Sequence, residues 1–319
     1  MIAVLCGGVG AARFLVALAR VAEPSDTVAI VNTGDDAVLH GLYISPDLDT
    51  VTYTLADAID SGRGWGLADE SWRAMGALQR YASVRPEGSS AAPMWFNLGD
   101  RDLATHFYRT ARLREGATLS EVTSEICAAW GVTQRLVPMS NQAVATVVTL
   151  ADGGDVSFQE YFVKLRHSVP VERVRFVGAD GAQLTPGADN LLTSAECVLI
   201  APSNPIVSIG PIRALGGVDA LLGARRSSVV AISPIVGGAA LKGPADRMMR
   251  ELGHTPSVVG VARLYAPIAG TLVIDPIDAH LAEAVEAEGM RAVVTPSVMS
   301  SPAVGAELAR VALQAASGQ

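Results

Sequence analysis

The sequence predicts an α/β fold: a Rossmann-like, doubly wound and mostly parallel sheet with a helical insertion that covers its crevice. Three observations predict this fold. The apolar run at residues 2–6 leads into a glycine turn and a helical pattern, the usual start of a nucleotide-binding α/β unit. A second apolar run follows at residues 27–32, and strand and helix patterns alternate through the second half of the chain. Between them, residues 60–135 change in composition and contain several amphipathic helical segments.

The first strand ends on Gly7-Gly8-Val9-Gly10, and the pattern AARFLVALARVA after it predicts a helix. Glycines at this place let the backbone approach a phosphate, which the N–H groups of the new helix then face. The loop departs from the dinucleotide fingerprint, because Arg13 stands where the third glycine would be, and it lacks the Gly-Lys-Ser/Thr of a P-loop. A glycine turn that serves only close packing is the alternative. The position at the carboxyl end of the first strand favours ligand binding.

The second strand is apolar on both faces, as a buried parallel strand should be, and it runs into an acidic stretch. Ser45-Pro46 predicts a helix start within this stretch, with Asp47 or Asp49 near its N-cap. Each aspartate alone can be a turn or cap residue, but crowded carboxylates repel each other unless a metal ion, a basic side chain or water lies among them. Asp57, deeper in the helix, is interpreted as structural. Residues 31–57 contain Asp35, Asp36, Asp47, Asp49 and Asp57.

We interpret residues 60–135 as a helical insertion within one α/β domain of residues 1–319. Residues 83–93 have the composition of a mobile loop, and an acidic motif that contains Arg101 and His106 follows it. Arg101 can be a ligand-binding residue or form a local salt bridge between two aspartates. A lone His106 is more often a helix-surface or satisfied residue than a catalyst. Three of the four tryptophans lie in this insertion before Phe96: Trp65, Trp72 and Trp95.

The second half of the chain returns to the strand and helix alternation. Residues 134–150 form two strand-like runs split by a polar turn, residues 156–167 are helix-like, and residues 172–177 are strand-like. The strand at residues 195–201 ends in Pro202-Ser203-Asn204-Pro205, a rigid polar shelf. Further strand-like runs lie at residues 258–262, 271–275 and 291–296, with helices at residues 278–289 and from about Pro302 onward.

A second glycine-rich loop is predicted where Ser233-Pro234 ends another strand. Gly237 and Gly238 follow, and Lys242 comes shortly after them. Backbone N–H groups of such a loop, together with the lysine, can hold an anion. Lys242 is one of only two lysines in the chain, so an anionic ligand must be held mostly by backbone N–H groups, arginines or a metal ion.

Composition excludes several classes of protein. The net charge of -8 and the lack of a Lys/Arg-rich tract argue against a nucleic-acid-binding protein. Mean hydropathy is +0.33, but the most apolar windows, near residues 143–151 and 228–241, are short or broken by Ser, Pro and Gly, so we expect no membrane segment. No export signal is visible, and three unpaired cysteines predict neither disulfides nor a zinc site. We therefore expect a soluble cytoplasmic protein.

Several motifs, in order and nearly end to end, resemble one family. The motifs are GGVG, NTGDD, SPDLDTVTYTLAD, GDRDLATH, LVPMSNQ, APSNPIVSIGPI and AISPIVGG. They are similar to the 2-phospho-L-lactate transferase family of coenzyme F-420 biosynthesis. The alanine-rich composition resembles its actinobacterial branch, the phosphoenolpyruvate transferases.

The resemblance implies a reaction. The phosphoenolpyruvate moiety moves from enolpyruvoyl-2-diphospho-5'-guanosine to the deazaflavin Fo, giving dehydro coenzyme F-420-0 and GMP. In the archaeal branch the donor is lactyl-2-diphospho-5'-guanosine. The sequence does not decide between the donors, because they differ by two hydrogens. The resemblance also implies a homodimer, and Mg²⁺ is the expected ion to neutralise the diphosphate.

The resemblance assigns roles to residues. Asp49 and Arg101 would lie at the Fo and metal end of the site, with Asp49 as the main metal ligand. Asp36 and Asp35 would complete the metal shell or activate the attacking hydroxyl, and Asp36 would also contact Fo. Residues 60–135 would form the acceptor side of the site. The guanosine diphosphate part would be held by Gly8, Val9, Gly10, Ser203, Asn204 and Ser233, with Lys242 as a further candidate for a phosphate.

A second interpretation belongs to another class of protein. A non-catalytic regulatory nucleotide-binding protein of the gluconeogenesis-factor type resembles this family in its N-terminal glycine loop. Such a protein needs no acceptor chemistry. The SPDLD and GDRDLATH motifs therefore favour the transferase.

Overall fold

The computed structural model describes residues 1–318. A seven-stranded sheet forms its centre, in the order β14-β13-β10-β9-β1-β2-β5, and every neighbouring pair is parallel. The predicted α/β fold with a parallel sheet is thus confirmed. The strands are β1 (Ile2–Cys6), β2 (Thr27–Val31), β5 (Arg135–Pro138), β9 (Cys197–Ile200), β10 (Val229–Ile232), β13 (Thr271–Ile274) and β14 (Arg291–Val294).

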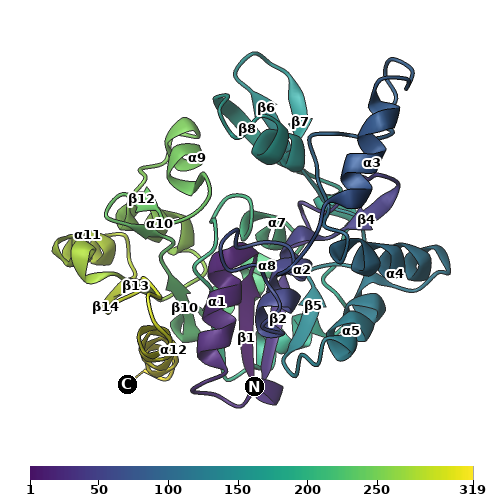
Figure 1. Cartoon of the computed structure of the whole chain (residues 1–319). Coiled ribbons are helices and arrows are strands. Elements are labelled where there is room, and N and C mark those ends of the chain that lie inside the picture. The colour runs from purple at the N-terminus through teal and green to yellow at the C-terminus, as the bar shows by residue number, and fades with distance from the viewer. Residues whose placement is uncertain (319) are drawn as a thin grey trace.

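Helices cover both faces of the sheet (Figure 1). Along β1, Val4 and Cys6 join one buried cluster, whereas Ala3 and Leu5 join the other, because successive strand residues point to opposite faces. The first face carries α1 (Gly8–Leu18), α2 (Pro46–Leu55) and α12 (Pro302–Ala316). The second face carries α6 (Ala188–Ser194), α7 (Gly210–Arg213), α8 (Val218–Ala224), α9 (Ala245–Glu251), α10 (Val258–Tyr265) and α11 (Ala282–Ala287).

The order of the strands places a crevice beside β1. The chain runs from β1 to β2 and β5 on one side, and β9 then returns to the other side of β1. Ligands of open α/β sheets bind at such a reversal, outside the carboxyl ends of the strands. Cys6 is in register with Val31, and Leu5 with Ile200. The glycine turn, the acidic loop and the Pro202 shelf therefore meet at one edge.

Two predicted segments differ from the structure. Residues 258–262 were expected to be a strand but belong to α10, because the Ser257 hydroxyl accepts a hydrogen bond from the Gly260 N–H and so caps the helix. Residues 156–167 were expected to be helical, yet they begin in β7 (Asp155–Ser157), and only Glu160–Lys164 forms a short π-helix. In the second segment, Asp155–Ser157 pairs with the strand Ala145–Leu150, so strand pairing outweighs the local helical pattern there.

Smaller sheets and short helices complete the chain. An antiparallel hairpin precedes α2, and a three-stranded antiparallel sheet in the order β7-β6-β8 stands beside the carboxyl edge of the main sheet (Figure 1). The remaining strands are β3 (Ala37–Leu39), β4 (Leu42–Ile44), β6 (Ala145–Leu150), β8 (Val171–Val177), β11 (Ile235–Val236) and β12 (Ala239–Ala240). Short 3-10 helices lie at Pro24–Asp26, Ala179–Gly181, Arg226–Ser228 and Pro276–Leu281.

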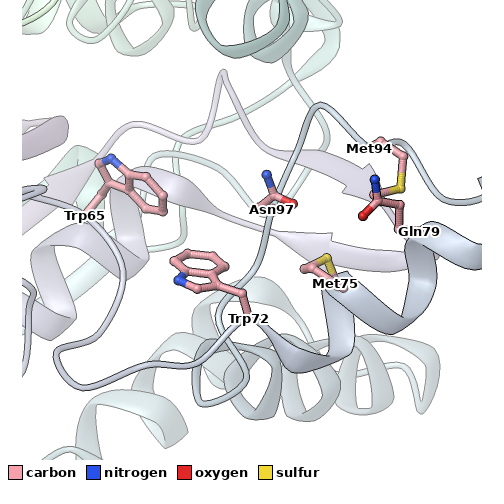
Figure 2. A pocket seen from close by; sticks show the side chains of 7 residues that line it. Trp65, Trp72, Met75, Gln79, Met94 and Asn97 are labelled. Atoms are coloured by element: carbon pink, nitrogen blue, oxygen red, sulfur yellow. The ribbon is translucent and has the colours of Figure 1, made fainter.

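Residues 60–135 contain three helices: α3 (Arg73–Ala82), α4 (Asp102–Arg114) and α5 (Leu119–Ala129). Helix α5 begins at a capping box formed by Thr118 and Glu121 and packs against β5. The loop before α3 and the loop after it enclose a pocket with a cavity volume of about 360 Å³ (Figure 2). Its walls are Trp65, Trp72, Met75, Gly76, Gln79, Met94 and Asn97.

Two further expectations concern composition. Within residues 1–318, no helix is long and apolar enough to cross a membrane. Cys6, Cys127 and Cys197 are all buried and all free, as their spacing predicts.

Candidate active site

Asn32 organises the acidic loop at the end of β2. Its side-chain amide donates to Asp35 Oδ1 at 3.1 Å and to Asp47 Oδ2 at 2.9 Å. The amide oxygen accepts from the Gly34 N–H at 2.8 Å. One buried side chain thus brings a carboxylate from the loop and a carboxylate from the first turn of α2 together. Sequence reasoning placed Asn32 at the strand end but assigned it no role.

The glycine turn is shaped by close contacts with its neighbours. A side chain at Gly7 would collide with the Asp47 carboxylate, and one at Gly10 with the Pro202 carbonyl oxygen. The Ser203 hydroxyl donates to the Gly7 carbonyl at 2.9 Å and accepts from the Gly7 N–H at 3.2 Å, which joins the loops after β1 and β9. Close packing therefore explains two of the glycines.

The amino terminus of α1 keeps donors for a ligand. No side chain caps this helix, and the first N–H groups of a helix have no partners within it. The Asp47 carboxylate accepts from the Gly8 N–H, so this carboxylate already takes one donor. The N–H groups of Val9 and Gly10 in the first turn are then the donors that an anion can use.

Three carboxylates in the crevice lack a cationic partner. Among residues 1–318, Asp49 and Asp102 form ion pairs in this region, whereas Asp35, Asp36 and Asp47 form none. Burial raises the pKa of Asp47 to about 6, against hydrogen bonds from Asn32 and Gly8 that lower it. Burial, and then the charges of Asp47 and Asp36, raise the pKa of Asp35 well above 3.8.

Asp36 has the most exposed position of these three carboxylates and one unused oxygen. Its Oδ2 accepts from the Ser45 hydroxyl at 2.7 Å, while its Oδ1 is shielded from solvent and has no hydrogen-bond partner within residues 1–318. Burial raises its pKa well above 3.8, although the Ser45 hydrogen bond and the charge of Arg109 lower it. Such a group needs either a proton or a cation.

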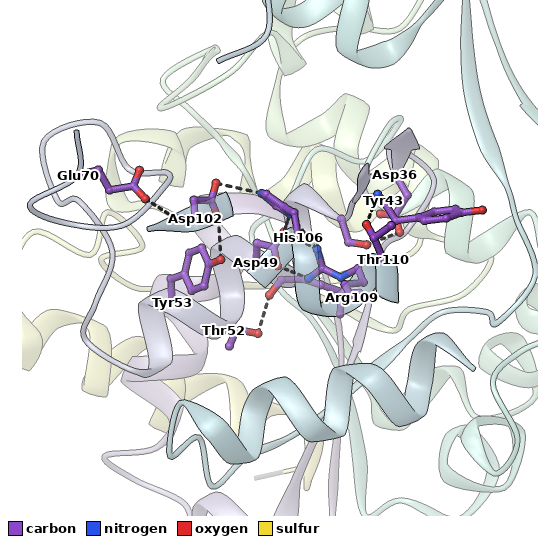
Figure 3. A network of polar contacts seen from close by, with 12 residues as sticks. Asp36, Tyr43, Asp49, Thr52, Tyr53, Glu70, Asp102, His106, Arg109 and Thr110 are labelled. Atoms are coloured by element: carbon purple, nitrogen blue, oxygen red, sulfur yellow. Dashed lines mark hydrogen bonds and ion pairs between the residues drawn. The ribbon is translucent and has the colours of Figure 1, made fainter. Parts of the chain in front are cut away.

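Asp49 is held by an arginine that sequence reasoning did not select. Arg109 of α4 contacts both Asp49 oxygens, with 3.1 Å between Nη1 and Oδ2 (Figure 3). The Arg109 side chain is only 2% exposed. Burial lowers its pKa, but the adjacent Asp49 carboxylate outweighs burial and leaves this pKa raised. Asp49 is therefore a partnered carboxylate, unlike its three neighbours.

His106 continues the same network toward the insertion. Its Nδ1 is 3.8 Å from Asp49 Oδ2, and its Nε2 is 3.1 Å from Asp102 Oδ2 (Figure 3). Tyr53 donates to Asp102 Oδ1 at 2.6 Å, and the Asp102 N–H donates to Glu70 at 2.6 Å. Burial acts to raise the pKa of Asp102, but its contacts with His106 and Tyr53 prevail and lower it.

This network fixes the insertion against α2. His106 is 1% exposed, so it is not a helix-surface residue. Asp102, His106 and Arg109 lie on one face of α4, because they are four and three residues apart. That polar stripe was the signal in the sequence that could have identified Arg109.

Arg101 does not form the local salt bridge that was the alternative to a ligand role. Its Nη1 donates to the Ala68 carbonyl at 2.7 Å, and no ion pair with Asp100 or Asp102 forms in the described part of the chain. The guanidinium is exposed on the insertion. Asp49 is paired with Arg109, and no ion pair between Asp49 and Arg101 forms within residues 1–318.

The predicted nucleotide-binding side chains bond to their own turns. Besides the Ser203 contact with Gly7, the Asn204 side chain accepts from the Ile206 N–H at 2.9 Å, and the Ser233 hydroxyl donates to the Ile235 carbonyl at 2.9 Å. Ser203 and Ser233 are buried. These residues shape the crevice floor through their turns.

The second glycine-rich loop is a hairpin turn between β11 and β12. Gly237 and Gly238 have positive φ angles, and the Gly237 N–H donates to Asp278 at 2.9 Å, so this donor is already used. Lys242, in contrast, lies beside Gly64, which is also close to Val9 of the first glycine turn. A Cβ added at Gly64 would lie 2.6 Å from Lys242 Nζ and 3.7 Å from Val9. Lys242 is exposed and forms no ion pair within residues 1–318.

The crevice carboxylates offer oxygen ligands of the kind that Mg²⁺ prefers. No group of three or more His, Cys, Asp or Glu side chains within residues 1–318 is arranged to hold a metal ion. Mg²⁺ does not require such a group, since it is often bound by one or two carboxylates together with waters and substrate phosphates. The partnerless Oδ1 of Asp36 fits this role. The Asp49 carboxylate could bind Mg²⁺ only while it also remains paired with Arg109.

Comparisons with known proteins agree with the geometry. The family model described as 2-phospho-L-lactate transferase CofD matches residues 2–306. The phosphoenolpyruvate transferase of Kitasatospora aureofaciens is 42% identical over 318 residues, 98% of this chain and 96% of that protein. The phosphoenolpyruvate transferase of Mycolicibacterium smegmatis is 39% identical over 329 residues, 99% of this chain and 98% of that protein.

A solved structure supports the fold alone. The crystal structure of a UPF0052 family member from Bacillus halodurans has a TM-score of 0.60 at 15% identity and covers 98% of each chain. The family, in contrast, is shown by the model match and by relatives that align over nearly the whole chain. The chain therefore belongs to the 2-phospho-L-lactate transferase CofD family, the transferases of coenzyme F-420 biosynthesis.

Proposed function

We propose that this protein transfers the phosphoenolpyruvate moiety from enolpyruvoyl-2-diphospho-5'-guanosine to Fo, giving dehydro coenzyme F-420-0 and GMP. The observation that carries the proposal is the set of three carboxylates without a cationic partner, Asp35, Asp36 and Asp47, beside the open amino terminus of α1. The names of the curated relatives support this donor over the lactyl one.

In the proposed reaction, the terminal hydroxyl oxygen of the ribityl chain attacks the phosphorus that bears the enolpyruvate. The new P–O bond replaces the phosphoanhydride bond, the electron pair of that bond leaves with GMP, and the hydroxyl proton goes to a base. Asp35 and Asp36 suit this base role in their ionised forms, because burial raises the pKa of each and so makes each carboxylate a stronger proton acceptor.

The donor diphosphate is proposed to lie across the glycine turn. The N–H groups of Val9 and Gly10 belong to the amino terminus of α1, and Val9 and Lys242 Nζ both lie against Gly64. Lys242 supplies a positive charge that no carboxylate of the described chain neutralises. Cation and N–H donors together would stabilise the charge that develops on GMP as it leaves.

Mg²⁺ is proposed as the cofactor. When bound, it would neutralise the diphosphate and polarise the phosphorus under attack. Asp36 would hold it through Oδ1, and Asp49 would contribute while remaining paired with Arg109. The proposal of a homodimer rests on the family resemblance alone.

The test is mass spectrometry of the product formed from Fo with each of the two donors, with and without Mg²⁺. We expect dehydro coenzyme F-420-0 from the enolpyruvoyl donor, and reversible loss of turnover on chelation by EDTA. Asp36→Asn should abolish the product without unfolding the protein. A matched control is Asp57→Asn, because Asp57 is exposed just beyond α2 with φ 52°, a conformation that asparagine adopts readily.

Three outcomes would contradict the proposal. Product from the lactyl donor only would assign the protein to the alternative donor. Turnover that is indifferent to EDTA would exclude the magnesium mechanism. Asp36→Asn with near wild-type turnover would remove Asp36 from both the metal and the base role.

A further inference from the structure

The three-stranded sheet β7-β6-β8 holds the acidic loop that follows β2. The Thr146 N–H of β6 donates to the Gly34 carbonyl at 2.6 Å. The side-chain amide of Gln159, just beyond β7, donates to the Asp35 backbone carbonyl at 3.2 Å and to Asp35 Oδ2 at 3.3 Å. Gln159 lies 124 residues after Asp35 in the chain. A distant segment therefore sets where this loop lies, yet no step of the proposed reaction uses Gln159.

Two neutral amides hold the Asp35 carboxylate by both of its oxygens. Oδ1 accepts from the Asn32 side chain at 3.1 Å, while Oδ2 accepts from Gln159. Donors on both oxygens fix the plane of the carboxylate, because rotation about its Cβ–Cγ bond would break both hydrogen bonds. An amide supplies no charge. Asp35 is thus oriented without being neutralised, whereas Arg109 both orients and neutralises Asp49.

The turn that carries Gln159 is itself anchored. The Leu165 N–H donates to the Glu160 carbonyl, five residues earlier, at 2.8 Å, which is the bond of a π-helix. Such turns are rare and frequently lie at functional sites. Tyr161 is fully buried and packs in a cluster with Val148, and Gln159 is only 5% exposed. A buried amide on an anchored turn has little freedom, so it can set the position of its partner.

Gln159 also acts on the backbone that leads into Asp36. Because its amide bonds the Asp35 carbonyl as well as the carboxylate, it fixes the peptide between these two aspartates. Asp36 is the residue whose Oδ1 has no hydrogen-bond partner within residues 1–318. A misplacement of about 1 Å in a catalytic arrangement can cost about 100-fold in rate. Gln159 can therefore affect the reaction without touching a substrate.

We propose that Gln159 is a positioning residue: its amide holds the Asp35 carboxylate and the adjoining peptide in the arrangement that attack by the acceptor hydroxyl requires. This assignment rests on the proposed function. Loss of the amide should slow the chemical step and leave substrate binding unchanged, so kcat should fall while both KM values stay the same. A substrate-binding residue would change KM instead, and a purely structural residue would change only stability.

Three variants separate these roles. Gln159→Met keeps the length of the side chain and removes the amide. Gln159→Asn keeps an amide but is one methylene shorter, so it should not reach both Asp35 oxygens. Gln134→Met is the matched control, because Gln134 is 4% exposed and its amide donates to the Leu15 carbonyl at 3.0 Å. Gln134 directly precedes β5, so it lies at the amino edge of the sheet, opposite the crevice.

Steady-state kinetics with Fo, the enolpyruvoyl donor and Mg²⁺ measure the effect, and urea unfolding measures stability. We expect Gln159→Met to lower kcat by about tenfold or more, the size of a lost hydrogen bond to a charged group, with both KM values within about twofold of wild type. Gln159→Asn should behave in the same way. Gln134→Met should lower the urea midpoint as Gln159→Met does, while its kcat stays within about twofold of wild type.

A double-mutant cycle tests the contact without any turnover. In wild type, Gln159→Met leaves a buried carboxylate short of a donor, whereas in the Asp35→Asn background it leaves only a neutral amide. The loss of urea midpoint caused by Gln159→Met should therefore be at least about twofold smaller in the Asp35→Asn background. If Gln159→Met does not fold, Gln159→Asn takes its place in the cycle and in the kinetics.

Several outcomes would overturn the assignment. It is wrong if Gln159→Met turns over as wild type does, or if a KM rises by as much as kcat was expected to fall. It is equally wrong if Gln134→Met loses as much kcat, because weaker folding would then explain both losses. If wild type forms no product from Fo, the proposed function fails, and the cycle alone decides whether Gln159 positions Asp35: coupled midpoints support the assignment, and additive midpoints overturn it.

Discussion

The buried pair of Asp49 and Arg109 allows a quantitative prediction. Arg109→Met removes the cation and leaves the Asp49 carboxylate buried at 6% exposure without its partner. Removing one member of a buried ion pair typically costs about 3–5 kcal/mol, whereas replacing both members with neutral groups costs much less. We therefore expect Arg109→Met to lower the free energy of unfolding by about 4 kcal/mol. The Asp49→Asn/Arg109→Met double variant should recover about 2 kcal/mol relative to additivity.

Urea unfolding followed by circular dichroism at pH 7 measures these differences, with constant m-values as the check on two-state behaviour. Arg112→Met is a control on the same helix, because Arg112 is 32% exposed where it pairs with Glu125. An exposed pair should contribute less than about 1 kcal/mol. Two results would refute the idea that this pair fixes α4 and Asp49. One is a loss of less than about 1 kcal/mol in the unfolding free energy of Arg109→Met. The other is a double variant whose loss equals the sum of the two single variants.

Three further predictions follow from the crevice. Burial raises the pKa of Asp47 from 3.8 to about 6, so the folded state binds this proton more tightly than the unfolded state does. The stability of Asp47→Asn relative to wild type should therefore grow by roughly 2 kcal/mol as pH rises from about 4 to 7. A difference in unfolding free energy that does not change with pH would contradict this. Gly10→Ala should lower the free energy of unfolding, measured in urea, by about 1–3 kcal/mol, because the added Cβ meets the Pro202 carbonyl. Gly216→Ala is the control: its Cβ would lie in open space, so its free energy of unfolding should stay within about 0.5 kcal/mol of wild type. Equal effects of the two substitutions would refute the close approach at Gly10. Millimolar Mg²⁺ should raise the thermal midpoint of wild type but not of Asp36→Asn, and an equal rise in both would place the ion elsewhere.

Much of the fold is encoded locally. The strands β1 and β2 are apolar on both faces, and the turn after β1 is rich in glycine. Both strands, and the position of the ligand-binding edge at their carboxyl ends, are therefore predictable from the residues themselves. Residues 258–262 show where such reasoning ends. Their β-branched run is typical of a strand, yet the Ser257 cap and the packing of α10 on the sheet make it a helix.

The candidate site was predictable in part for the same reason. Asp35 and Asp36 follow a recognisable strand, so their place at the carboxyl edge is local information. The partner of Asp49 is not local, because Arg109 lies 60 residues further along the chain and reaches it through the tertiary packing of α4 on α2. The pocket of Trp65 and Trp72 likewise depends on how loops and α3 fold together.

The most direct test of the central claim is a single-turnover measurement of GMP release with and without Fo, in the presence of Mg²⁺ and the enolpyruvoyl donor. If the carboxylates around Asp36 serve transfer to an acceptor hydroxyl, one GMP should appear for each Fo converted, and no GMP should appear without Fo. GMP released at the same rate in the absence of Fo, or no GMP at all, would contradict the account.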